Sequence, residues 1–139
     1  MTDDNTLSGG GGNDTLVGIA GQDTLTGGAN ADTFLYRNVA DSVGVGPGPA
    51  AFDIVVDFTQ SQSDRVDLRA IDAITGTPAN DTFTFIGSAI FGSVAGQLRF
   101  EATGPSDTKV EADVNGDGVA DLFIKFTGAI TLTAADFVL

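Results

Sequence analysis

The 139-residue chain contains no histidine and no cysteine. These absences exclude disulfide bonds, zinc sites of the usual ligand types, cysteine or histidine nucleophiles and Ser-His-Asp triads. Basic residues are also scarce, with 6 Lys+Arg against 19 Asp+Glu and a net charge of −13. A chain this acidic is expected to bind cations and not nucleic acid. No apolar run approaches membrane-spanning length, so we expect no membrane insertion.

The acidic residues are almost all aspartate, since Glu101 and Glu111 are the only glutamates. A solvated helical surface would favour glutamate, whereas aspartate suits turns and sites for hard cations. The chain is 42% hydrophobic, which excludes a disordered acidic tail. A halotolerant surface is the alternative interpretation of the charge.

A nine-residue repeat runs from residue 9 to residue 35 as GGGGNDTLV, GIAGQDTLT and GGANADTFL. The sixth position is Asp14, Asp23 and Asp32, and counting forward puts Asp41 there as well. The eighth position is apolar, which predicts short strands whose apolar side chains stack in a column. Glycine lets the turn carbonyls converge, and carbonyls with a carboxylate form an oxygen shell suited to Ca²⁺. A flexible linker and a metal-free parallel β-helix are the alternatives.

The repeat resembles the nonapeptide G-G-x-G-x-D-x-U-x of repeats-in-toxin (RTX) proteins, a calcium-binding β-helix unit. The resemblance implies that each ion lies between two turns 18 residues apart. One implied site takes oxygens from Gly10, Gly12 and Asp14 together with Gly27, Ala29 and Asp32. A second implied site takes them from Ile19, Gly21 and Asp23 together with Tyr36, Asn38 and Asp41. In these repeats Ile19 and Asn30 replace glycines, so only conformational ease is lost there.

The rest of the chain predicts strands and no strong helix. FDIVVDF (52–58) alternates with Phe52, Ile54, Val56 and Phe58 on its apolar side. The stretches DTFTFIG, GQLRFEA, TKVEADV and DLFIKFTG are also strand-like, and residues 43–51 read as a loop. We therefore expect an all-β fold, a parallel β-roll of calcium-binding nonapeptides followed by an antiparallel β-sandwich-like cap. Residues 1–139 would form a single module, with repeats in 1–42 and the β-rich part in 43–139.

Nearly the whole chain also resembles the C-terminal region of serralysin-type secreted metalloproteases. The stretches that carry this resemblance are ADTFLY, ADSV, FDIVVDFTQSQSDRVDLRAIDA, DTFTFIGSAIFGSVAGQLRF and DFVL. The resemblance implies calcium ligands near Asp41 and Asp53, with Asp57 weaker; solvent-facing acids of an amphipathic strand are the alternative. It also implies export to the extracellular medium by a type I secretion apparatus. Zinc proteases of that family need H-E-x-x-H, so protease activity does not carry over to a chain without histidine.

Two further segments carry a predicted role. DVNGDGVAD places oxygen ligands at alternate positions, as in the first part of an EF-hand-type loop, although strands flank it. Its predicted ligands are Asp113, Asn115, Asp117, Val119 and Asp121. An ordinary hairpin turn is the alternative. The C-terminal DFVL, which is Asp136, Phe137, Val138 and Leu139, resembles the terminal secretion signal of serralysin-type proteins, and a last core strand is compatible with that role.

These observations predict a non-catalytic module of a larger secreted protein, which folds when it binds calcium outside the cell. The alternative function is a calcium-dependent accessory module that binds an acidic polysaccharide beside a carbohydrate-active enzyme. A free-standing glycoside hydrolase would need paired acids, for which Asp64, Asp67 and Glu101 are the candidates.

Overall fold

The computed structural model describes residues 3–43 and 52–139. Within these ranges the regular structure consists of eleven β-strands and three short 3₁₀ helices. The strands are β1 (Thr6–Gly11), β2 (Thr15–Leu16), β3 (Thr24–Ala29), β4 (Thr33–Leu35), β5 (Asp53–Val55), β6 (Arg65–Asp67), β7 (Thr84–Phe85), β8 (Gln97–Thr103), β9 (Asp107–Asp113), β10 (Leu122–Thr127) and β11 (Phe137–Val138). The 3₁₀ helices are η1 (Val39–Asp41), η2 (Gln60–Gln62) and η3 (Ala134–Asp136).

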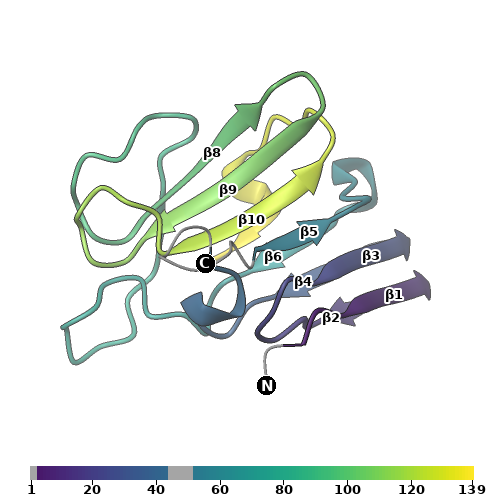
Figure 1. Cartoon of the computed structure of the whole chain (residues 1–139), viewed down its shortest axis with the longest axis horizontal. Coiled ribbons are helices and arrows are strands. Elements are labelled where there is room, and N and C mark those ends of the chain that lie inside the picture. The colour runs from purple at the N-terminus through teal and green to yellow at the C-terminus, as the bar shows by residue number, and fades with distance from the viewer. Residues whose placement is uncertain (1–2, 44–51) are drawn as a thin grey trace.

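The strands form two sheets. The seven-stranded sheet has the order β1-β3-β5-β10-β9-β8-β7, and the four-stranded sheet has the order β11-β6-β4-β2. The strands of the repeats occupy one end of the molecule and the antiparallel strands β8 to β10 the other (Figure 1). No helix formed by the described residues is both long enough and apolar enough to cross a membrane.

The nonapeptides wind as a parallel roll. β3 lies parallel to β1 with Leu25 beside Leu7, and β4 lies parallel to β2 with Phe34 beside Leu16. Successive repeats therefore alternate between the sheets, and the apolar residues form two facing columns instead of one. The columns are Leu7, Leu25 and Val55 in the larger sheet, and Leu16, Phe34, Val66 and Phe137 in the smaller. Each sheet buries its column against the other.

The roll continues beyond the recognisable repeats. β5 pairs in parallel with β3, and β6 pairs in parallel with β4. Val55 and Val66, both 0% exposed, take the places that Leu25 and Phe34 hold one wrap earlier. These two short strands thus form a further wrap, and both sheets run past residue 43.

The antiparallel part extends one sheet of the roll. β8, β9 and β10 pair antiparallel, and β10 then pairs in parallel with β5. Their inward side chains, such as Leu98, Val110 and Phe126, share one core with the roll. The predicted fold class, a parallel β-roll followed by an antiparallel β-rich part, is confirmed.

The predicted inward face of 52–58 is wrong for most of its length. Asp53 and Val55 are both 0% exposed, whereas Val56 is 38% exposed; Phe58 points inward as predicted. The cause is the register of the roll, because pairing of Val55 with Leu25 turns the alternate residues of β5 inward. Of the expected loop at 43–51, only Val43 lies within the described residues.

Candidate metal centre

Carboxylates stack along both rows of turns in the roll. In one row Asp23 Oδ1 accepts the backbone N–H of Asn5 at 2.8 Å, and Asp53 Oδ1 accepts that of Asp23 at 2.9 Å. In the other, Asp32 Oδ1 accepts the N–H of Asp14, and Asp64 Oδ1 that of Asp32, both at 2.9 Å. Each aspartate thereby ties its own wrap to the wrap before it. We call Asn5, Asp23 and Asp53 the first column, and Asp14, Asp32 and Asp64 the second column.

The remaining oxygen of most of these carboxylates has no protein partner. The Oδ2 atoms of Asp14, Asp23, Asp32 and Asp53 are buried without a hydrogen bond. Leaving a buried charged acceptor unsatisfied costs more than the roughly 1–3 kcal/mol of a neutral group. Asp64 differs, because its Oδ2 accepts the N–H of Thr59 at 2.8 Å. The free oxygens therefore belong to consecutive pairs, Asp14 with Asp32 and Asp23 with Asp53.

Glycine at the first position of the repeat makes room for these carboxylates. A Cβ on Gly9 would lie 2.6 Å from Asp14 Oδ2, and one on Gly27 would lie 2.5 Å from Asp32 Oδ2. Gly18 stands against Asp23 in the same way. The motif thus pairs a first-position glycine with a sixth-position aspartate because the carboxylate folds back over the turn.

The second and fourth positions of each repeat are left-handed. The second-position φ is 94° at Gly10, 73° at Ile19 and 103° at Gly28. The fourth position shows the same, with 84° at Asn30. Asparagine tolerates this region, whereas a β-branched residue is strained there. Ile19 is therefore the residue of the repeats that departs furthest from its preferred backbone conformation.

The structure brings together the residues of the first implied site. Gly10 lies beside Gly28, Gly11 beside Ala29, and the N–H of Gly12 donates to Ala29 O at 3.1 Å. Asp14 and Asp32 are adjacent in the second column. All six implied ligands, Gly10, Gly12, Asp14, Gly27, Ala29 and Asp32, therefore lie in two stacked turns.

The residues of the second implied site are not arranged as the nine-residue count predicts. Asp53, and not Asp41, follows Asp23 in the first column. Asp41 instead caps η1, where its Oδ2 accepts the N–H groups of Arg37 and Asn38 at 2.8 and 3.0 Å. The nonapeptide register ends after β4 because residues 36–41 turn into this 3₁₀ helix.

Burial makes it costly to ionise the acidic side chains of this second site. It raises the pKa of Asp53 to about 7, and the neighbouring Asp23 carboxylate adds to the rise. Burial likewise raises the pKa of Tyr36 well above 10, and nearby Asp53, Asp23 and Asp41 raise it further. These acids therefore lie close enough to repel one another when no cation is bound.

Two further aspartates, one predicted only as a weaker ligand and one not predicted as a ligand, hold the turns together. Asp57, rated weaker than Asp53, accepts the N–H groups of Gly27 and Gly28 with both oxygens at 2.8 Å. Asp64 closes the second column and was considered only as a catalytic acid. The signal in the sequence is the pattern aspartate, any residue, apolar residue, which DTL shares with DIV at Asp53 and DRV at Asp64. Because Asp53 and Asp64 do not follow the nine-residue period, a search for that period does not find them.

The predicted loop at 113–121 is closed by its own side chains. Asp113 is 0% exposed and accepts the N–H groups of Gly116 at 2.6 Å and Gly118 at 2.8 Å. Asn115 accepts the N–H of Asp117, and Asp121 accepts that of Val114. The side-chain oxygens of the loop therefore accept N–H groups of the loop itself, and these hydrogen bonds also suit an ordinary hairpin turn.

Comparison with known proteins decides the family. A family profile described as Peptidase M10 serralysin C terminal matches residues 2–139. The chain belongs to the serralysin C-terminal family. This membership supports a calcium-binding module of the RTX β-roll type, a part that is non-catalytic in serralysin itself. Serralysins are secreted proteins.

A solved structure with the same fold is the AlgE6R3 subunit of the Azotobacter vinelandii mannuronan C5-epimerase. It is 23% identical, with a TM-score of 0.57, and the match covers 99% of this chain and 80% of that one. The AlgE6R2 subunit of the same epimerase matches 98% of this chain and 86% of its own at 23% identity, with a TM-score of 0.48. A search of curated protein sequences finds no significant match.

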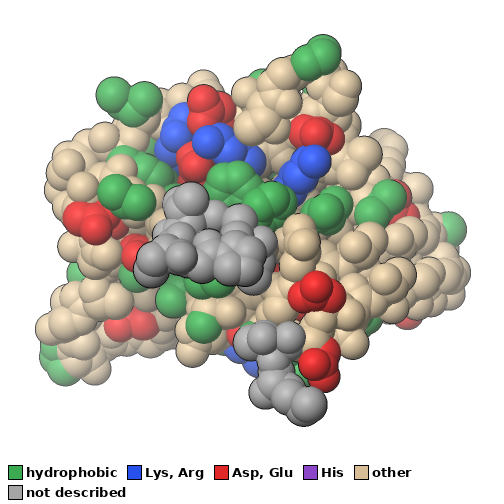
Figure 2. All heavy atoms as spheres, in the orientation of Figure 1, with side chains coloured by type: hydrophobic (Ala, Val, Ile, Leu, Met, Phe, Trp, Pro, Cys, Tyr) green, Lys and Arg blue, Asp and Glu red, His purple; other side chains and the backbone are tan. Residues whose placement is uncertain are grey.

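In this serralysin C-terminal module, other groups of the protein engage each of the three acids considered for glycoside hydrolysis. Asp64 is held by backbone N–H groups, Asp67 contacts Arg69 at 2.7 Å, and Glu101 contacts Lys109 at 2.8 Å. Hydrogen bonding to those bases lowers the pKa of Asp67 and of Glu101. Figure 2 shows acidic and basic side chains gathered over the antiparallel strands. These acids are therefore engaged in ion pairs and amide contacts.

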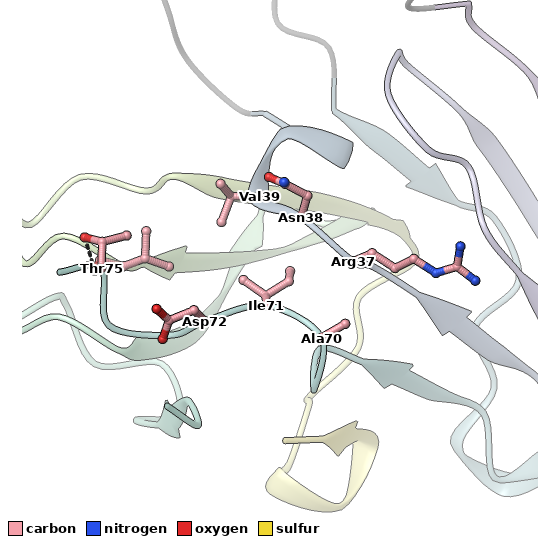
Figure 3. A pocket seen from close by; sticks show the side chains of 8 residues that line it. Arg37, Asn38, Val39, Ala70, Ile71, Asp72 and Thr75 are labelled. Carbon is pink, nitrogen blue, oxygen red and sulfur yellow. Dashed lines mark hydrogen bonds between the residues drawn. The ribbon is translucent and has the colours of Figure 1, made fainter. Parts of the chain in front are cut away.

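A hollow of about 240 Å³ lies between residues 37–39 and 70–75. Figure 3 shows the Arg37 side chain extending away from the other labelled residues. The Thr75 hydroxyl donates to Val114 O at 3.0 Å, so it is engaged within the protein.

Among the described residues no three acidic side chains form a ready-made metal cluster. Backbone carbonyls must therefore supply many of the oxygens at any ion in the turns.

Proposed function

We propose that the chain is a non-catalytic module that folds when it binds calcium and that directs type I secretion of the protein it belongs to. The observation that carries this proposal is the set of four buried, unpartnered carboxylate oxygens in the turns. A hard divalent cation would satisfy these oxygens and relieve their mutual repulsion. Membership of the serralysin C-terminal family supports the same assignment.

The free oxygens suggest which residues hold the ions. Asp14 and Asp32 would hold one, together with the turn carbonyls of Gly10, Gly12, Gly27 and Ala29. Asp23 and Asp53 would hold another, with carbonyls of Ile19 and Gly21, and with Tyr36, Asn38 and Asp41 beside them. The loop of Asp113, Asn115, Asp117, Val119 and Asp121 is proposed as a third site. Calcium supplies positive charge at each of these places.

Calcium then becomes part of the stability of the module. Extracellular-type sites have dissociation constants of roughly 10⁻⁴ M, so millimolar calcium contributes about 1.5–2 kcal/mol per site. Three such sites contribute several kcal/mol, which is comparable with the whole stability of a small domain. At the low calcium concentration inside a cell the contribution nearly vanishes. We therefore expect an unfolded chain during export and a folded one outside.

The C-terminal residues support an export signal that is read before folding. Phe137 is buried, and β11 pairs with β6. Asp136 accepts the N–H of Thr133 at 2.6 Å and the Gln60 side chain at 2.8 Å. In the folded module this segment is a sheet strand, so a secretion apparatus would bind it in the unfolded chain.

Far-UV circular dichroism during a calcium titration tests the folding part. The chain should gain β-structure in calcium and stay disordered in chelator. Magnesium should not substitute, because it requires a tight octahedral shell. Full structure and unchanged heat resistance in excess chelator would refute the proposal.

Deletion of residues 136–139 tests the export part. Secretion through a type I apparatus should be lost, while the purified variant still folds in calcium. Phe58→Ala is the matched control, since it also removes a buried aromatic contact but leaves the terminus intact. If the deletion variant were exported like the wild type, the signal would lie elsewhere.

The polysaccharide-binding alternative has less support. The likeness to the epimerase subunit is one of fold alone. Of the six basic residues, four already form ion pairs with acidic side chains: Arg69, Arg99, Lys109 and Lys125. A glycan-binding assay with and without calcium would detect an acidic polysaccharide held through the ions.

A further inference from the structure

Tyr36 occupies an unusual place at the end of the repeats. It is the only tyrosine of the chain, and it stands at the first position of the fourth repeat, where the three earlier repeats have glycine. Its side chain is 1% exposed and belongs to the hydrophobic core. Its backbone N–H donates to Asp67 O at 3.0 Å, which fixes the residue beside β6.

The phenol hydroxyl of Tyr36 points at the acids of the first column. It lies close enough to interact with the Asp53 carboxylate, and Asp23 and Asp41 are also near. Yet no described residue makes a hydrogen bond of normal geometry with this hydroxyl. Oδ2 of Asp23 and Oδ2 of Asp53 are likewise buried and unpaired. Three buried polar groups without hydrogen-bond partners thus lie close together, an arrangement that costs free energy until a cation orders them.

We propose that Tyr36 is a positioning residue for calcium, and that its hydroxyl hydrogen-bonds the Asp53 carboxylate while Asp53 and Asp23 hold the ion. This inference rests on the proposed calcium function. Donors behind the ligands of a metal orient the ligating groups, and their loss typically weakens binding 10- to 100-fold. The phenol carries a donor and is fixed by core packing, so it can hold Asp53 in one orientation.

The Asp14–Asp32 pair provides an internal comparison. The first positions of its repeats are Gly9 and Gly27, which carry no side chain. The two pairs therefore share the contact of a carboxylate with the N–H of the preceding aspartate but differ in this hydroxyl. Removal of the hydroxyl should weaken one roll site and leave the other unchanged.

Tyr36→Phe tests the positioning role because it keeps the ring and removes only the hydroxyl. Isothermal titration calorimetry with calcium should show one class of sites weakened about tenfold and the other classes unchanged. Thr108→Val is the matched control. It removes another fully buried hydroxyl, which bonds Gly128 and Ile130. The control should lower stability without a site-selective change in affinity.

Terbium luminescence tests the placement of the ion. The chain has one tyrosine and no tryptophan, so light absorbed by tyrosine sensitises only a terbium ion near Tyr36. In the wild type we expect tyrosine-sensitised emission that saturates at a single ion. Asp53→Asn should abolish or strongly weaken it, whereas Asp32→Asn should retain it. The reverse pattern would overturn the placement.

The outcomes separate this inference from the proposed function. If Tyr36→Phe binds calcium like the wild type while folding still requires calcium, the role of Tyr36 is refuted and the proposed function stands. An equal loss at every class of site would indicate a purely structural role and would also refute the inference. If the wild type folds in chelator and binds neither calcium nor terbium, the proposed function itself fails.

Discussion

Asp53→Asn should have opposite effects on the metal-free and the calcium-bound protein. Asp53 is 0% exposed, its Oδ1 accepts the N–H of Asp23, and its Oδ2 has no partner. Asparagine keeps an acceptor for that N–H and removes the charge. Its amide also brings donors toward the unpaired oxygen of Asp23. The substitution therefore relieves the charge repulsion in the metal-free fold, which it stabilises. It also removes a proposed ligand from the calcium-bound state, which it destabilises.

The structure sets the size of the two effects. A carboxyl whose pKa rises from 3.8 to about 7 destabilises the folded state by on the order of 4 kcal/mol once it is ionised. In chelator at pH 8 the variant should gain up to about that free energy of unfolding. The gain in stability that calcium brings should shrink by about 1.5–2 kcal/mol, the contribution of one site.

The pH dependence has a definite sign. Because the folded-state pKa of Asp53 is raised, its stabilising contribution is present below the unfolded value of 3.8 and is lost as pH rises through about 7. The metal-free wild type should therefore become more stable on acidification from pH 8 to pH 5. Asp53→Asn should show much less of this dependence.

Urea unfolding followed by circular dichroism measures both effects. The series runs from chelator to millimolar calcium, with the same concentration of a stabilising osmolyte throughout so that the metal-free fold is populated. Asp107→Asn, which removes a partly exposed carboxylate paired with Lys125 at 3.0 Å, is the control and should change both states alike. A variant that is less stable in chelator and keeps the full calcium response would refute the reasoning.

Four other substitutions, one of them a control, test the turns. Gly27→Ala should lower the free energy of unfolding by about 1–3 kcal/mol in urea melts, because its Cβ would meet Asp32 Oδ2 at 2.5 Å. Gly11→Ala, where no atom lies within 4 Å, should stay within about 0.5 kcal/mol. Ile19→Gly should raise stability by about 1 kcal/mol, since Ile19 is 64% exposed and has a φ of 73°; a loss would contradict the assigned strain. Asp113→Asn should remove one ion from the calcium stoichiometry in titration calorimetry, and an unchanged count would make the loop an ordinary turn.

The sequence predicts the roll where it is periodic. Aspartate every nine residues at Asp14, Asp23 and Asp32, with an apolar residue two places later, is enough to predict stacked turns. The stacking of Gly10 on Gly28 and of Asp14 on Asp32 follows from that period alone. Local periodicity is informative here because each wrap contacts only its neighbours.

Where the period breaks, local sequence no longer determines the partner. Asp53 lies 30 residues after Asp23, and Asp64 lies 32 residues after Asp32, yet both take the next place in their columns. The described residues between them include η1 and η2, which the nonapeptide repeats lack, so pairing depends on where the chain returns to the sheet. Alternation in FDIVVDF suggested the opposite face, because both faces of that segment carry apolar residues. Long-range register decided between them.

Asp64 makes the two ends of the second column different. Its two oxygens accept the N–H groups of Asp32 and Thr59, so hydrogen bonds from the backbone satisfy both oxygens of this carboxylate. Asp32 and Asp14, the earlier members, each keep a free oxygen. The column is thus complete at the end that joins the C-terminal strands, and every earlier wrap is held by a carboxylate of the wrap that follows. We therefore expect the roll to depend on bound cations at Asp14 and Asp32 but not at Asp64.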